Sequence, residues 1–549
     1  MAIAAYIASP SGVRKLFLFI FTSLLLYFAV HLVRYHFLLV TFPYPLEYRE
    51  GAVLFTTNLL LKGENPYTLE HMPTAINVYG IVYHLVVYPV ARLWGATFVV
   101  HRAVSAAFLL FSLVLFFVVL RRYQVRVLYS LSAVLILFAS LLDRFTPLAR
   151  PDGLGFFLFL ASIFTAYLQH YSTRSLIVSA VLGIAAFYTK AYFVLSIPYL
   201  FLYLFLFVSK EKAILYGGIS FSLLILTALI VNKVFETYFL NAFFNHMNVA
   251  TNDLNHLRVQ LAWFLIYNAG LVLILIVYLS LSTFDKISGD SWQTASVGII
   301  VKKLRDLVHI LRFDKPLVEV AFPISLHCLI LSCGLFYLKL GRHNGNMMTY
   351  AYQLMSPFFV LLTYSAFNSP LKKLRSAKFI KHYNYALLMP CILLSLYLLY
   401  SSATALADPG AKESREVWRR IETITLAYRH IMNSPLIVSM LMQQNKTVYD
   451  AGQTEFFQYS HYSFSWLDGP LPSNGEISMQ WENYQNSVNQ AILKQEFDAV
   501  IVTPREYGFY LEDLTKNYIK VSTVGICMLH TAQCAPLEIW EPKTSDAQD

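Results

Sequence analysis

The chain has 549 residues, of which 57% are hydrophobic and only 13% carry a charged side chain. This composition excludes an ordinary soluble globular protein and is typical of a chain that crosses a membrane many times. The formal net charge of +10 comes largely from Lys and Arg residues in short segments between apolar runs, so it indicates membrane topology and not a nucleic-acid partner.

About eleven apolar runs approach the length of roughly 20 residues that a spanning helix needs. The first run is too long for the apolar part of a cleavable signal peptide, and no small-residue cleavage site follows it, so we expect a retained first helix. The expected spans are residues 16–40, 103–120, 127–142, 153–168, 175–188, 191–208, 214–231, 260–282, 318–340, 349–367 and 384–402.

Lys and Arg residues fall in every second loop, as the positive-inside rule requires of cytoplasmic loops. We therefore expect a multi-pass protein with its N-terminus in the cytoplasm. A helix over residues 299–312, where basic and apolar residues alternate, is expected to lie on the inner leaflet. The loops expected in the cytoplasm hold Arg14, Lys15, Arg121, Arg122, Arg126, Arg174, Lys210, Lys212 and the segments VKKLRDLVHILRFDKP and LKKLRSAKFIKH.

The same alternation divides the chain into a membrane domain, residues 1–403, and a small extracytoplasmic domain, residues 404–549. The second domain has soluble composition, and its segments TVYDAG and FDAVIVTP predict buried strands with helices between them, so we expect an α/β fold. Cys527 and Cys534 lie in this domain, where a disulfide forms only if the compartment is oxidising. Their spacing alone leaves the disulfide open.

Two glutamates follow the first span in the stretch PYPLEYREG, residues 43–51. Glu47 and Glu50 are three residues apart, so both carboxylates point the same way if the chain remains helical there. Like charges at this spacing repel each other unless a ligand or partner uses them. Simple solvation at the membrane edge is the alternative.

Three further charged residues fall on the same expected face of the membrane. Arg150 and Asp152, in ARPDG, open one span, and Lys190, in FYTKAY, separates two apolar runs. An ammonium at this depth requires an anionic partner or snorkels to the interface. A carboxylate beside such cations fits a lipid-phosphate substrate, because the cations hold the phosphate while the carboxylate deprotonates the acceptor nucleophile.

Metal use is left open by the sequence. His246, Asp253 and His256 share one outer loop but lack the spacing of a metal site, so we interpret them as ordinary polar loop residues. No metal ligand is assigned, a divalent metal remains an option, and no other cofactor is expected.

In order and sidedness, these motifs resemble those of the GT-C membrane glycosyltransferases. More narrowly, the chain looks like the branch that contains the protein O-mannosyltransferases and the bacterial aminoarabinose transferase of lipid A. The resemblance covers roughly residues 10–400 and rests on LEYREG, GENPY, NVYGIVYHL, HRAVSA, ARPDG, FYTKAYFVLSIP and HNGNMMTYAYQLMSPF.

The resemblance implies an inverting hexosyl or pentosyl transfer from a polyprenyl-phosphate donor to a lipid, glycan or protein acceptor. The reaction is expected at the outer face of the bacterial cytoplasmic (inner) membrane, as part of cell-envelope glycan synthesis. Glu47 is then the catalytic base and Glu50 its partner. Arg150 and Asp152 are assigned to the donor phosphate and sugar, and Lys190 is assigned to the phosphate.

Arg102 and Tyr83 are further donor-binding candidates, and a structural role for Arg102 is an equal alternative. The stretch from Tyr79 to His84 departs from the Pro-Pro or Lys-Pro-Pro step often present in the family, so its donor contacts do not carry over. The alternative function is a transporter or flippase for an amphiphilic, lipid-linked anion. Such a protein is expected to contain paired repeats with broken helices, and the sequence has no internal repeat.

Overall fold

The computed structural model describes residues 10–245 apart from 77, 143 and 144, and residues 353–364, 389–399, 411–452, 472–504, 511–527 and 534–544. It also describes single positions between 258 and 328 and between 457 and 462. Four helical stretches in the described part are long and apolar enough to cross a membrane. The chain is therefore a polytopic α-helical membrane protein. These stretches are Lys15–Thr41, Phe98–Arg122, Ala191–Val208 and Lys210–Val234.

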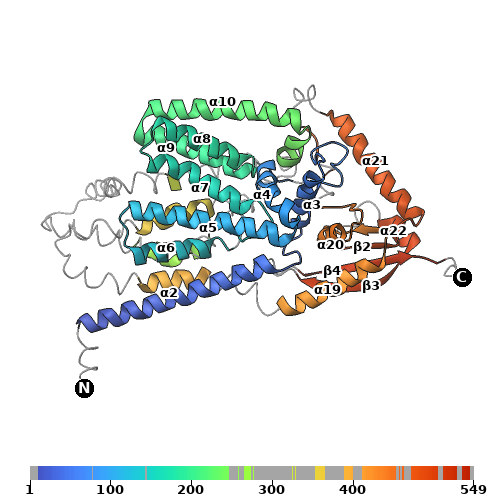
Figure 1. Cartoon of the computed structure of the whole chain (residues 1–549), viewed down its shortest axis with the longest axis horizontal. Helices are drawn as coiled ribbons and strands as arrows, with labels where there is room; N and C mark the ends of the chain where they lie inside the picture. The colour runs from blue at the N-terminus through green and yellow to red at the C-terminus, as the bar shows by residue number, and fades with distance from the viewer. Residues whose placement is uncertain are drawn as a thin grey trace, which may run out of the picture.

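The helices expected before residue 235 are all present, and several run side by side in a bundle (Figure 1). The expected spans 260–282 and 318–340 and the helix expected over 299–312 lie largely or wholly outside the described residues. Within the last two expected spans, Gln353–Tyr364 and Met389–Leu399 are helical. The elements are α2 (Pro10–Thr41), α3 (Glu50–Leu61), α4 (Ile81–Trp94), α5 (Phe98–Arg122), α6 (Val127–Ser140), α7 (Asp152–Leu168), α8 (Thr173–Phe187), η1 (Ala191–Leu195), α9 (Ser196–Tyr203), η2 (Leu204–Val208), α10 (Lys210–Val234) and η3 (Leu240–Phe244).

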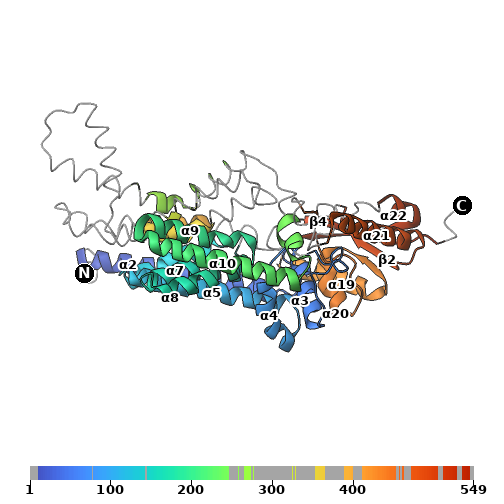
Figure 2. The same ribbon diagram turned by 90° about the horizontal axis from the view of Figure 1, so that it is seen from above.

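The two ends of the bundle differ in what they carry. Helices α3 and α4 lie at the end next to the C-terminal sheet, and the view from above shows the same arrangement (Figure 2). The turns after α5 and α7 and the start of α10 lie at the opposite end, and these hold the basic residues expected in the cytoplasm (Figure 1). Which end faces the cytoplasm stays a prediction.

The C-terminal part contains a four-stranded mixed sheet of order β1-β2-β4-β3, in which β1 and β2 are parallel and the other neighbours antiparallel. The fully buried strand β2 is the one predicted from FDAVIVTP. The proposed domain boundary after residue 403 falls outside the described residues. The elements are α19 (Ala411–Ala427), β1 (Ile431–Asn433), η5 (Pro435–Ile437), α20 (Val438–Gln443), α21 (Asn474–Leu493), β2 (Ala499–Val502), α22 (Leu511–Asn517), β3 (Tyr518–Cys527) and β4 (Cys534–Pro542).

For this part, one expectation is wrong and one open question, the disulfide, is answered. The prediction of a strand at TVYDAG is wrong, because residues 447–452 form a loop. The Asn433 side chain holds this loop, accepting a hydrogen bond from the Tyr449 N–H at 2.8 Å and donating one to the Asp450 carbonyl at 2.7 Å. Cys527 and Cys534 face each other across the β3–β4 hairpin and form a disulfide.

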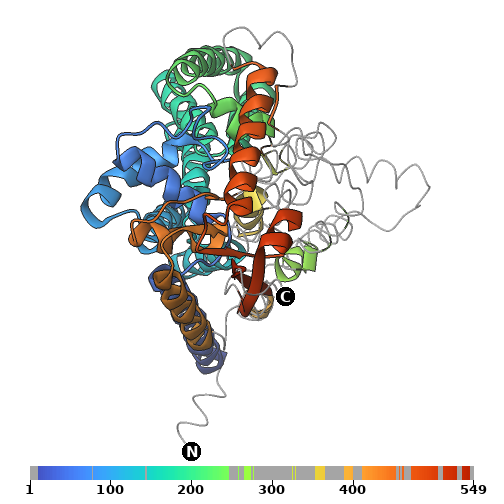
Figure 3. The same ribbon diagram turned by 90° about the vertical axis from the view of Figure 1, so that its right-hand side faces the viewer.

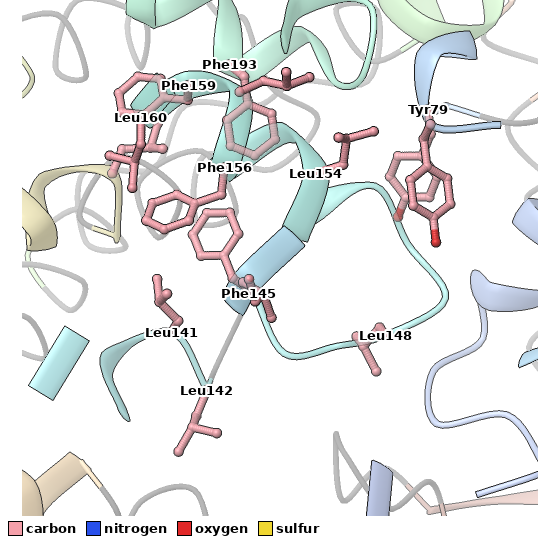
Figure 4. Packing of buried hydrophobic residues seen from close by; sticks show 14 of the residues in the cluster. Tyr79, Leu141, Leu142, Phe145, Leu148, Leu154, Phe156, Phe159, Leu160 and Phe193 are labelled. Carbon is pink, nitrogen blue, oxygen red and sulfur yellow. The ribbon is translucent and has the colours of Figure 1, made fainter. Parts of the chain in front are cut away.

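Aromatic packing fixes the segment that leads into α7. The ring of Phe145 lies 4.8 Å from that of Phe156 and 6.0 Å from that of Phe193, measured between centroids. Figure 4 shows these rings packed together, with the loop beyond Leu148 passing beside Tyr79 before it enters α7. Inside a bilayer, such van der Waals packing holds helices together, because lipid tails are as apolar as the side chains. The packing therefore holds the segment before α7 against α7 and η1.

Candidate active site

A chain of buried ion pairs joins four of the predicted site residues at the sheet end of the bundle. Arg150 lies 3.6 Å from the Glu47 carboxylate and 3.0 Å from that of Asp152, whose other oxygen is 2.9 Å from the Lys190 ammonium. None of the four side chains is more than 8% exposed. They come from three separate segments: the loop before α3, the start of α7, and the turn between α8 and η1. The folded chain therefore assembles them into one site.

Arg49 belongs to the same cluster and was not among the predicted residues. Its side chain lies 3.6 Å from the Glu47 carboxylate, and its backbone N–H donates to that carboxylate at 3.1 Å. Its position two residues after Glu47 was the available signal. Among these five side chains, three cations face two carboxylates, which leaves one surplus positive charge when all are ionised.

The pKa of Lys190 follows from this environment. Burial lowers it to about 7, although the Asp152 carboxylate acts in the opposite direction. An additional anion next to the ammonium favours the charged form and raises the pKa again. The cluster is therefore suited to an anionic group such as a phosphate.

Tyr79 lies against both cations that flank Asp152. Its ring centroid is 5.5 Å from the Arg150 guanidinium carbon and 4.9 Å from the Lys190 ammonium, within the range of cation–π attraction. A short backbone pairing brings these segments together, because the Gly80 N–H donates to the Thr189 carbonyl at 3.1 Å.

Only glycine fits at position 80 in this pairing. A Cβ atom added there would lie 1.9 Å from the carbonyl oxygen of Tyr188, far inside van der Waals contact. The Val82 N–H donates to that same carbonyl at 3.1 Å. The absence of a side chain at Gly80 therefore allows the approach that places Tyr79 beside Lys190.

Glu50 does not share a helix face with Glu47, so the expectation of two parallel carboxylates is wrong. Helix α3 begins only at Glu50, and Glu47 lies in the preceding turn. Burial raises the pKa of Glu50, but Arg102 and the backbone N–H groups of Ala149 and Leu46 lower it more, and the net pKa is below the usual value.

The Glu50 carboxylate is surrounded by donors. Arg102 donates to both of its oxygens, at 2.8 and 2.6 Å, and the N–H groups of Ala149 and Leu46 each donate at 2.7 Å. A weaker bond comes from the Glu47 N–H at 3.3 Å. A carboxylate held in this way ties three segments together and is poorly placed to accept a further proton.

Arg102 and Tyr83 are also engaged with the protein itself. Besides Glu50, the Arg102 guanidinium donates to the carbonyl groups of Phe42 and Tyr44 at the end of α2. The Tyr83 hydroxyl donates to the His101 carbonyl at 3.1 Å and lies 3.2 Å from the Ser105 hydroxyl. Both side chains are fully buried, so the geometry favours positioning over donor contact.

Metal ligands are not grouped in the part of the chain that the structure describes: no set of three His, Cys, Asp or Glu side chains there has the geometry to hold a metal ion. His246, Asp253 and His256 lie outside the described residues.

No family model and no curated protein matches this chain. Among solved structures, the chain is similar to ArnT from Cupriavidus metallidurans, in its crystal structure bound to undecaprenyl phosphate. That similarity has 10% sequence identity and a TM-score of 0.47, and it covers 94% of this chain and 98% of that chain. Similarity at this level assigns no role to any residue of this chain.

Proposed function

We propose that this protein is a membrane glycosyltransferase that moves a sugar from a polyprenyl-phosphate donor to an acceptor outside the cytoplasmic membrane. The observation that carries the proposal is the buried chain from Glu47 through Arg150 and Asp152 to Lys190. The site lies at the end of an apolar helical bundle, where a lipid-borne donor meets an acceptor from water. The motifs that resemble those of the GT-C transferases supply these same residues.

The proposed chemistry is one displacement with inversion. The Glu47 carboxylate accepts the proton of the acceptor hydroxyl, whose oxygen attacks the anomeric carbon of the sugar. The bond between that carbon and the phosphate oxygen breaks, and its electron pair stays on the departing polyprenyl phosphate. Arg150 and Lys190 stabilise the charge that develops there, with Arg49 as a third cation next to the base.

The roles of the other predicted residues differ in this scheme. Asp152 positions Arg150 and Lys190, which both contact its carboxylate. Glu50 and Arg102 position the loop that carries Glu47. The proposal also places the N-terminus in the cytoplasm and residues 404–549 outside, as a separate α/β domain.

The test is transfer from a panel of radiolabelled polyprenyl-phosphate sugars to endogenous acceptors, with purified full-length protein in liposomes. The proposal requires transfer by the wild type with at least one donor and its loss in Glu47→Gln. If the wild type binds polyprenyl phosphate but transfers none of the sugars, the proposal fails and a transporter or flippase becomes the preferred function.

A further inference from the structure

The loop between α2 and α3, residues 42–49, carries Glu47. Side chains of this loop contact side chains of helix α19. The Tyr44 ring stacks on Trp418 with centroids 6.0 Å apart, and its hydroxyl donates to the Glu422 carboxylate at 3.0 Å. The guanidinium of Arg415 lies 5.7 Å from the centroid of the Phe42 ring. Figure 3 views α19 in front of α2, and Figure 1 shows that α19 lies past the end of α2, next to the C-terminal sheet.

A second contact reaches the same loop from its other end. A Cβ atom added at Gly51, directly after Glu50, would lie 2.6 Å from the Pro435 carbonyl oxygen and 3.3 Å from the Val438 Cβ. Helix α3 thus begins in direct contact with η5 and α20 of the C-terminal part (Figure 1). The Ala451 N–H adds a hydrogen bond to the Thr74 carbonyl at 3.0 Å.

Glu47 and Arg49 lie between these two contacts, whereas Arg150 and Lys190 have other supports. Arg150 precedes α7 by two residues, and Lys190 lies between α8 and η1, within the bundle. A change at the contact with the C-terminal part therefore displaces the Glu47 carboxylate relative to Arg150 and Lys190. Such a displacement affects proton removal more than phosphate binding.

From these contacts, and resting on the proposed function, we infer that residues 411–452 are part of the catalytic apparatus. Helices α19 and α20 position Glu47 by holding Tyr44 and Gly51 on either side of it. Glu47 is the catalytic residue in this account, and Tyr44, Gly51 and Glu422 are positioning residues. The C-terminal part is accordingly required for turnover even when the donor is already bound.

The first variant is Gly51→Ala, whose methyl group meets a backbone carbonyl that cannot rotate away. Alanine favours a helix over glycine, so α3 itself is not weakened by the change. The control is Gly218→Ala in α10, where a Cβ atom meets nothing within 4 Å. We expect kcat to fall about 100-fold in Gly51→Ala, as misplaced catalytic groups do, with the KM for the donor unchanged.

Hydrogen exchange provides a readout that does not depend on activity. In Gly51→Ala, the backbone amides of residues 44–52 are expected to exchange faster than in the wild type, while those of residues 152–168 keep their rates. Wild-type exchange and wild-type kcat in this variant overturn the inference. Absence of transfer by the wild type overturns the proposed function instead, and the exchange comparison still tests the contact.

The second variant keeps the test valid if Gly51→Ala does not fold. Tyr44→Phe removes the hydroxyl that donates to Glu422 but keeps the ring stacked on Trp418. We expect a fall in kcat of about fivefold, the size of one lost hydrogen bond, again without a change in the donor KM. A rise in KM with an unchanged kcat contradicts the positioning role.

Discussion

Arg102 binds both carboxylate oxygens of Glu50, from Nε at 2.8 Å and from Nη2 at 2.6 Å, across 52 residues of sequence. Neither side chain has any exposed surface. The same guanidinium holds the Tyr44 carbonyl at 2.8 Å, and the same carboxylate holds the Ala149 N–H at 2.7 Å. One ion pair thus fixes the end of α2, the start of α3 and the segment before α7 to helix α5.

Loss of this pair is expected to destabilise the protein strongly. Glu50→Gln leaves the Arg102 charge buried without its carboxylate, a change that costs about 3–5 kcal/mol at buried pairs. Equilibrium unfolding in detergent measures the change. The control is Glu64→Gln, which removes a carboxylate that is 42% exposed and 3.4 Å from His71. Equal unfolding free energies for the two variants would contradict the structural role of Glu50.

Lys190 gives donor binding a defined pH dependence. Because its pKa in the free protein is lowered to about 7, the ammonium keeps its proton below pH 7 and loses it above. A phosphate that needs the charged form must then take up a proton on binding, so affinity falls as pH rises, by up to about tenfold per unit. Calorimetry with polyprenyl phosphate between about pH 6 and pH 9 measures this fall.

The matched variant for that measurement is Lys190→Arg. The guanidinium stays charged throughout this range, so the variant is expected to bind with an affinity that depends little on pH above 7. A wild-type affinity that is constant from neutral to alkaline pH contradicts the role of Lys190.

The disulfide of the β3–β4 hairpin is expected in the protein isolated from membranes. Of the five cysteines in the sequence, Cys527 and Cys534 should resist alkylation until a reductant is added. With seven residues of separation, replacing both by serine should cost the C-terminal part about 2.5 kcal/mol of stability in the chain-entropy account. Alkylation of all five before reduction would place the hairpin in a reducing compartment.

Gly80→Ala is expected to separate Tyr79 from Lys190. The new methyl group meets the Tyr188 carbonyl, so the two paired segments must move apart. Overpacking of this kind costs about 1–3 kcal/mol, and donor affinity should fall with it. Gly525→Ala is the control, since a Cβ atom there meets nothing within 4 Å. Unchanged affinity in Gly80→Ala would show that this pairing does not shape the site.

The sequence predicted helices better than it predicted contacts. The runs 16–40 and 214–231 form α2 and α10. A long apolar segment in a membrane must satisfy its backbone hydrogen bonds internally, and an α-helix does this. Strand β1 has only three residues, too few for a periodic pattern, and was missed. TVYDAG predicts a strand because Thr447, Val448 and Tyr449 favour strands and a turn-forming Asp and Gly follow, but residues 447–452 form a loop.

At the site, too, individual residues could be predicted from the sequence but their contacts could not. Charged residues next to apolar spans are rare, which singles out Glu47, Arg150 and Lys190, and the structure brings these three into one cluster. The separate role of Glu50 was not foreseen, since its partner Arg102 lies 52 residues away and no local pattern relates them. Helical spacing alone predicts Glu50 beside Glu47, but Glu47 lies in the turn before α3 and its carboxylate has other partners than that of Glu50.

The most direct test compares the donor kinetics of Glu47→Gln and Lys190→Met in liposomes. If Glu47 is the base, its replacement should lower kcat about 100-fold to 10,000-fold and leave the donor KM near the wild-type value. Lys190→Met should raise the donor KM, because it removes a cation from the phosphate site. Wild-type kcat in a folded Glu47→Gln would contradict the central claim that this carboxylate activates the acceptor.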